Sequence, residues 1–145
     1  SMLWQTPTIH GSAWCRGRAD WLSDDGKFDV DLKTVDSADP VAFASRQVYS
    51  NNYDIQAGLR WLGHRALAKQ RDMLWLLVEI EAPYACSLVG ASDELLELAV
   101  RKIDHAARIW RQCLNTKTWP GYPSTTQWAQ ATTGAAWDAE ARGIV

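Results

Sequence analysis

Two aspartates and a lysine, Asp20, Asp31 and Lys33, occur at a spacing that could place them around one divalent metal ion. Between the aspartates lies the dipeptide Asp25-Gly26, a strong signal for a two-residue turn joining antiparallel strands. Around this turn, paired residue numbers sum to 51, so Asp20 is expected to face Asp31. Because side chains alternate along a strand, Lys33 should point to the same side of the hairpin.

Carboxylates directly opposite each other have Cβ atoms about 4.5–5.5 Å apart and repel unless a positive charge lies between them. Oxygen ligands of this kind suit Mg²⁺ or Mn²⁺, so the pattern predicts a metal site at Asp20 and Asp31. A lysine aimed at the same place could stabilise developing negative charge or orient a water molecule. The alternative is a solvated hairpin face on which Arg18 and Lys33 neutralise the acids directly.

The hairpin that must position these residues is predicted over residues 13–22 and 27–35. Its other face carries Trp21, Val30 and Leu32, which are apolar, so we expect that face to form the core. The acids beside the turn, Asp29 among them, are expected at the surface.

The remaining elements follow from apolar periodicity and capping residues. They predict a mixed α+β domain in the order β-β-α-α-β-β-α, with a central mixed sheet flanked by helices. We expect a single domain over residues 1–145 with an irregular tail over 123–145. The predicted elements after the hairpin are a short helix from Pro40 to about Tyr49, a second helix from Asn52, a strand over 73–80 buried on both faces, a strand over 85–89, and a long helix from Ser92 to about Asn115.

The composition limits the possible classes of protein. The net charge of −2 argues against coating nucleic acid by bulk charge but leaves room for a local basic groove. The three cysteines form no CxxC pair, and no apolar run could span a bilayer, so we expect a cytoplasmic protein with reduced thiols and no membrane contact. Four basic residues around the second predicted helix could contact DNA phosphates or belong to a solvated helix face: Arg46, Arg60, Arg65 and Lys69.

Five separated stretches resemble the PD-(D/E)XK nuclease superfamily, and in particular its exonuclease VIII-like branch from phage and prophage recombination systems. "CRGRADWLSDDG" resembles the first acidic strand and turn of that branch, and "VDLKT" its Asp-x-Lys strand. The other three stretches are "NYDIQAG", which resembles its Tyr-x-x-Gln helix, "VEIEAPYA", which resembles a later strand, and "WPGY", a C-terminal landmark.

The resemblance implies a Mg²⁺- or Mn²⁺-dependent exonuclease that resects the ends of linear duplex DNA. It implies that Asp20 and Asp31 bind the metal, that Lys33 assists the attacking water, and that Tyr53 and Gln56 approach from the next helix. It also suggests a homo-oligomer and a single-strand annealing recombinase as partner.

The chain departs from this branch at two points. Relatives often carry an aromatic residue four positions after the glutamine, where this chain has Arg60, and they carry a further acid on an upstream helix. Residues 1–12 hold no such acid, so we expect an N-terminally truncated chain whose own activity is weak or absent. The alternative function is a non-catalytic, degenerate nuclease-fold module that binds DNA or a recombination partner.

Overall fold

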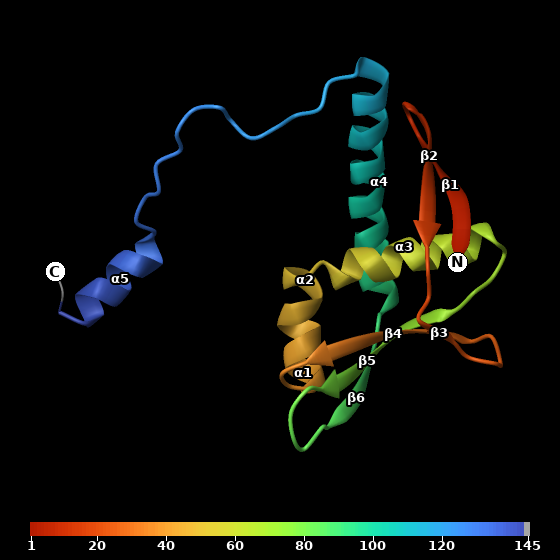
Figure 1. The fold of residues 1–145 in the computed structure, drawn as a ribbon, viewed down its shortest axis with the longest axis horizontal. Helices are drawn as coiled ribbons and strands as arrows, with labels where there is room; N and C mark the ends of the chain where they lie inside the picture. The colour runs from red at the N-terminus through yellow and green to blue at the C-terminus, as the bar shows by residue number, and fades with distance from the viewer. Residues whose placement is uncertain (144–145) are drawn as a thin grey trace.

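The structure is a computed structural model that describes residues 1–143, and it has the predicted mixed α+β architecture (Figure 1). A four-stranded sheet and a separate two-stranded sheet are combined with helices. In chain order the elements are β1 (Met2–Thr8), β2 (Gly11–Gly17), β3 (Trp21–Leu22), β4 (Phe28–Val35), α1 (Pro40–Ala42), η1 (Phe43–Gln47), α2 (Val48–Ser50), α3 (Tyr53–Ala66), β5 (Asp72–Glu79), β6 (Cys86–Gly90), α4 (Asp93–Thr116) and α5 (Thr133–Ala141).

The larger sheet has the strand order β3-β4-β5-β6 and is mixed. Strand β4 pairs antiparallel with β3 and parallel with β5, and β5 pairs antiparallel with β6. The predicted register of the β3–β4 hairpin is confirmed, since Trp21 pairs with Val30 and Leu22 with Asp29. The predicted two-residue turn is not formed, because the Gly26 N–H donates to the Ser23 carbonyl and residues 24–27 make up the loop. Gly26 has φ +76°, a left-handed conformation that glycine adopts without strain.

Helices α1, η1, α2, α3 and α4 lie over one face of this sheet, and the core forms beneath them (Figure 1). On β5 the buried residues alternate, because Met73, Trp75 and Leu77 all point toward the helices. Strand β5 is therefore buried on one face and not on both, which corrects the prediction made from its continuous apolar run. Other core residues are Val35, Phe43, Val48, Ala57, Val89 and Leu96.

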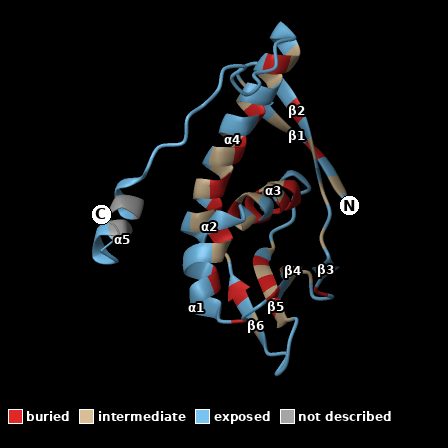
Figure 2. Cartoon of the chain, turned by 60° about the vertical axis from the view of Figure 1, so that its left-hand side comes forward, coloured by how far each residue is buried: buried red, intermediate tan, exposed pale blue. Residues whose placement is uncertain are grey.

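Helix α3 packs closely against both α4 and β1. A Cβ atom added at Gly58 would lie 2.5 Å from the Cβ of Ala99 on α4, and one added at Gly63 would lie 2.8 Å from the Trp4 ring. Both distances are too short for a side chain, so glycine permits these two contacts. Figure 2 shows the buried residues of α4 on the side that faces α3. The β1–β2 hairpin thus anchors α3 through Trp4. It was not predicted: residues 13–17, which were expected to pair with residues 27–35, pair with β1 instead, and only Trp21 and Leu22 pair with β4.

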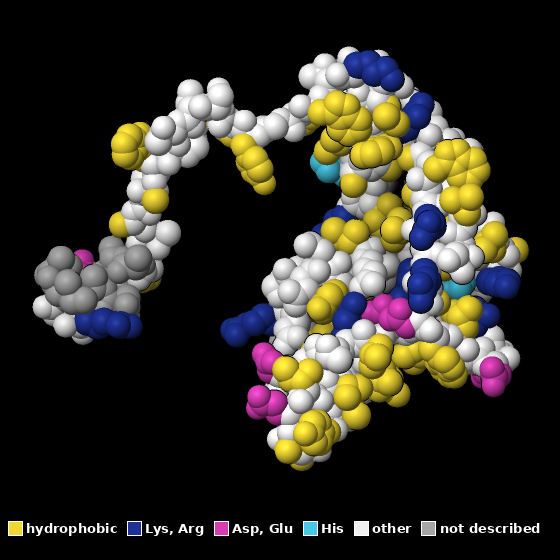
Figure 3. Space-filling model, in the orientation of Figure 1, with side chains coloured by type: hydrophobic (Ala, Val, Ile, Leu, Met, Phe, Trp, Pro, Cys, Tyr) yellow, Lys and Arg dark blue, Asp and Glu magenta, His cyan; other side chains and the backbone are white. Residues whose placement is uncertain are grey.

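The other face of the larger sheet is left uncovered by the helices of the described residues. Trp21 and Leu32, which were expected in the core, are 56% and 51% exposed. Hydrophobic side chains gather along this side of the molecule, below β4, β5 and β6 in the view of Figure 3. The predicted assignment of the two hairpin faces is therefore wrong, and the acidic face is the buried one.

After α4 the chain extends away from the body and carries α5 at its end (Figure 1). Residues 123–132 form no regular element, as expected, but α5 interrupts the predicted irregular tail, and the tail's last two residues lie outside the described part of the chain. Within residues 1–143, no helix combines the length and the hydropathy that crossing a bilayer requires.

Candidate active site

Strand β4 directs three charged side chains toward the helices. Asp29, Asp31 and Lys33 alternate with Val30 and Leu32, so they share one face of the sheet. Asp29 is fully buried and Asp31 is 2% exposed. Asp29 was expected at the surface, and its burial corrects that prediction. Two carboxylates on one buried face need positive partners, since an uncompensated buried charge is very costly.

Helix α3 supplies most of these partners from residues spaced by four. Gln56, Arg60 and His64 lie one above another on the helix face that meets β4. The Arg60 guanidinium bridges both acids, with Nη1 2.5 Å from Asp31 Oδ1 and Nη2 3.2 Å from Asp29 Oδ1. Nε2 of His64 lies 2.7 Å from Asp29 Oδ2. The acids of β4 are thus bound to the helix above them rather than open to solvent.

Lys33 lies at the more exposed end of this cluster. Its ammonium is 2.5 Å from Asp31 Oδ2 and donates a hydrogen bond of 2.7 Å to Gln56 Oε1. The Gln56 amide in turn donates to Asp31 Oδ1 at 3.2 Å. The Lys33 ammonium also lies 4.1 Å from the centre of the Tyr53 ring, within the range of a cation–π contact. Four of the five predicted catalytic residues, Asp31, Lys33, Gln56 and Tyr53, therefore meet in one place.

Asp20, the fifth, lies at the edge of this cluster. The β3–β4 pairing ends at Trp21 and Val30, one position before the predicted pairing of Asp20 with Asp31. Instead, the carboxylate of Asp20 accepts a hydrogen bond of 3.1 Å from the backbone N–H of Leu32. Asp20 is exposed. Its side chain takes the place that a longer β3 would have at the edge of β4, where it bonds to Leu32, the residue after Asp31.

The donor set fits a divalent cation that keeps part of its water shell. In the part of the chain that the structure describes, no group of three or more His, Cys, Asp or Glu side chains could hold a metal ion by itself. Mg²⁺, however, is commonly bound by one or two carboxylates plus waters and substrate phosphates. Asp31 Oδ2 is buried and has the Lys33 ammonium 2.5 Å away, but a carboxylate oxygen has two lone pairs, so it keeps one for a ligand. Asp20 and Asp31 could therefore hold the ion.

The predicted DNA contacts do not form one group. Arg60 is 3% exposed and paired with two acids, so it cannot reach a phosphate, and its predicted role as a DNA contact is wrong. Arg46, on η1, and Arg65, at the end of α3, are exposed, as is Lys69 in the following loop. These three residues keep the ability to contact DNA.

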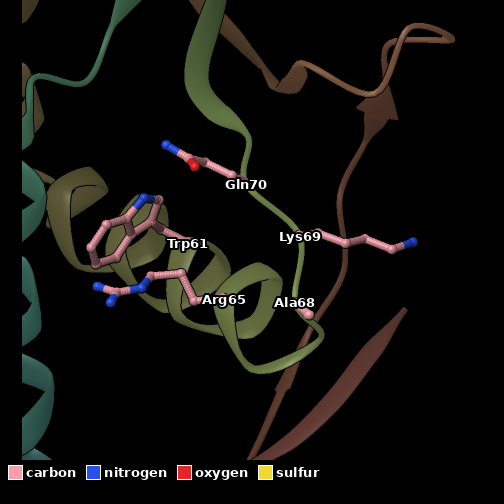
Figure 4. Close-up of a pocket in the computed structure, with 5 residues that line it drawn as sticks. All are labelled: Trp61, Arg65, Ala68, Lys69 and Gln70. Carbon is pink, nitrogen blue, oxygen red and sulfur yellow. The ribbon is translucent and has the colours of Figure 1, made fainter.

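Two hollows lie near the end of α3. The first, about 380 Å³, is lined by Trp61, Arg65, Ala68, Lys69 and Gln70 (Figure 4). There the Arg65 guanidinium lies 4.6 Å from the centre of the Trp61 ring, while the Lys69 side chain points away from that pair. Lys69 also lines a second hollow of about 210 Å³ together with Ala19, His64 and Arg71. Because His64 contacts Asp29, the Lys69 side chain lies near the buried acid cluster.

Asp29 and His64 are the members of the cluster that the sequence analysis did not select. Asp29 could have been found, because it precedes Asp31 by two residues and must share its face. His64 follows Arg60 by four residues, so the sequence alone places both on one face of the helix. Only the packing of α3 on β4 shows which acids these two side chains contact.

One family model matches the chain. It is described as a PDDEXK-like domain of unknown function (DUF3799) and covers residues 4–132. No curated protein matches the chain.

Proposed function

Because the chain belongs to this PDDEXK-like family, we propose that it is a divalent-metal-dependent deoxyribonuclease whose reaction is centred on Asp31 and Lys33. The observation that supports this most is the contact of Lys33 with both Asp31 and Gln56, within a domain of nuclease fold. The reaction would be hydrolysis of a phosphodiester, in which water adds to phosphorus and one sugar oxygen leaves.

In this proposal the charge of Lys33 acts where negative charge develops on the phosphoryl oxygens or on the attacking water. Gln56 and the Tyr53 ring hold the ammonium in position, and Asp31 forms an ion pair with it. A divalent ion held by Asp20 and Asp31 would supply Lewis acidity toward the phosphate and make water more acidic. Lys69 and Arg65 would contact the DNA backbone outside the cluster.

The finer assignment rests on the resemblance to exonuclease VIII-like enzymes. On that basis we infer that the substrate is the end of linear duplex DNA, that the product strand serves phage-type recombination, and that an annealing recombinase takes this strand. A homo-oligomer is part of the same proposal.

A second candidate is a module that binds DNA or a recombination partner without cleaving DNA. It is supported by the two cations already held by Asp31, namely Arg60 and Lys33, and by the small number of acids around it. The two candidates differ in one property: only the nuclease requires Lys33 for a chemical step.

The test is cleavage of a labelled linear duplex with Mg²⁺, comparing the protein with Lys33→Ala and with Lys27→Ala. Lys27 is the matched control, because its side chain is 71% exposed on the hairpin turn and pairs only loosely with Asp25. Loss of one preorganised charge-stabilising group typically costs about 10²–10³ in rate, so we expect this loss in Lys33→Ala alone, with DNA binding retained. Equal rates in all three proteins would contradict the role of Lys33, and binding without cleavage in the unmodified protein would favour the second candidate.

A further inference from the structure

The central feature is a guanidinium buried between two carboxylates in the candidate metal site. Arg60 is 3% exposed and bridges Asp29 and Asp31. With Lys33 also at Asp31, two cationic side chains face two carboxylates, so these four charges balance without any metal, and His64 contacts Asp29 as well. The sequence predicted a metal cation between Asp20 and Asp31, whereas the structure has Arg60 between Asp29 and Asp31, with Lys33 beside Asp31.

Arg60 cannot lose its positive charge when a metal ion binds. A guanidinium keeps its proton at every physiological pH. The contact to Asp29 also fixes Arg60 from the far side, and His64 in turn contacts Asp29. A metal ion that binds Asp31 must therefore do so with the positive charge of Arg60 still in place.

We propose that Arg60 is a resident counter-cation that stabilises the metal-free site and lowers its affinity for divalent ions. The inference rests on the proposed metal-dependent function, in which Asp31 is a metal ligand. Arg60 acts through Asp31 and is a positioning residue, since its burial keeps it from the substrate. Asp29 opposes it, because Asp29 neutralises part of the guanidinium charge and draws it away from Asp31.

The size of the effect follows from Coulomb's law. Even at the dielectric constant of water, a unit charge about 5 Å from a divalent ion changes an association constant by about tenfold, and a buried site enlarges this. Removal of the Arg60 charge should therefore tighten metal binding by about tenfold or more. Removal of the Asp29 charge should weaken metal binding by a similar factor, because Arg60 then acts on Asp31 alone.

The test is a Mn²⁺ titration followed by electron paramagnetic resonance of the free ion, without DNA. The unmodified protein is compared with Arg60→Gln, Arg60→Lys and Asp29→Asn. We expect tighter binding in Arg60→Gln, weaker binding in Asp29→Asn, and affinity near that of the unmodified protein in Arg60→Lys, which keeps the charge. Arg60→Lys and Asp29→Asn keep the test decisive if Arg60→Gln does not fold.

Tighter Mn²⁺ binding in Arg60→Gln together with weaker Mn²⁺ binding in Asp29→Asn would support the inference. Measurable Mn²⁺ binding in Arg60→Gln and in no other protein would support it too. Weaker binding in both Arg60 variants would overturn it, because Arg60 would then help Asp31 to bind metal. Unchanged affinity in every variant, or no binding in any of them, would overturn it too. The nuclease proposal is judged separately: if affinities follow the expected order but the unmodified protein does not cut DNA, the counter-cation stands and the nuclease fails.

Discussion

Replacing Asp31 by asparagine in the absence of metal should destabilise the protein. If the site were a pair of acids awaiting a cation, loss of one acid would relieve repulsion and stabilise the metal-free fold. The structure predicts the reverse, because Asp31 lies between the Arg60 guanidinium and the Lys33 ammonium and is 2% exposed. Asparagine keeps the volume and one acceptor oxygen but leaves the two cations with one acid fewer.

The magnitude follows from the burial of the pair. Removal of one partner from a buried ion pair typically costs about 3–5 kcal/mol. Lys33 is partly exposed and can turn toward solvent, so we take the lower end, about 3 kcal/mol. With a urea dependence of about 2 kcal/mol per molar, typical of small proteins, the unfolding midpoint should fall by about 1.5 M.

The assay is urea unfolding at pH 7 with a chelator present, followed by circular dichroism. Asp72→Asn is the matched control, since Asp72 is an exposed acid at the start of the neighbouring strand, and surface substitutions usually change stability by no more than about 0.5 kcal/mol. A midpoint for Asp31→Asn equal to or above that of the unmodified protein would refute the proposed charge balance.

Two further predictions concern packing and the hairpin turn. Gly58→Ala should destabilise the protein by about 1–3 kcal/mol in the same urea assay, because its Cβ would lie 2.5 Å from that of Ala99, whereas Gly121→Ala, with open space around it, should not; equal midpoints would contradict the close helix contact. Ser23→Ala should raise the pKa of Asp25. In the unmodified protein this pKa lies below its ordinary value, because the Ser23 hydroxyl and the Lys27 backbone N–H both donate hydrogen bonds to the carboxylate. The lowered pKa contributes stability above the unfolded-state pKa, and this stability is lost as pH falls through the folded-state pKa. Carboxyl NMR should therefore show Asp25 titrating at higher pH in the variant. An unchanged titration would contradict the role of the hydroxyl.

The hairpin shows which features local sequence can predict. Asp25-Gly26 predicted the register correctly, although the turn spans residues 24–27 and not Asp25-Gly26 alone. The same residues did not reveal which face is buried. Trp21 and Leu32 favoured the apolar face as the core, yet the buried face is the charged one. Its acids are compensated by α3, whose residues lie about thirty positions further along the chain, and no local pattern encodes that packing.

The candidate site shows the same division. Strand alternation placed Asp31 and Lys33 together, and helical spacing placed Tyr53 with Gln56, and the structure brings all four into contact. Arg60 was expected to be a DNA contact because arginines on helices are usually solvated. Arg60 is buried because α3 packs on β4 and brings it to Asp29 and Asp31, and this tertiary contact cannot be seen in the local sequence.

We propose that Asp31, together with Asp20, forms a divalent-cation site beside Lys33. The measurement that tests it most directly is paramagnetic broadening of backbone amide NMR signals by Mn²⁺ at substoichiometric concentration. We expect the amides of Asp20, Asp31 and Leu32 to broaden first, and we expect Asp31→Asn to abolish this broadening while the fold is retained. Strongest broadening elsewhere, or the same broadening in Asp31→Asn, would contradict a cation site at Asp20 and Asp31.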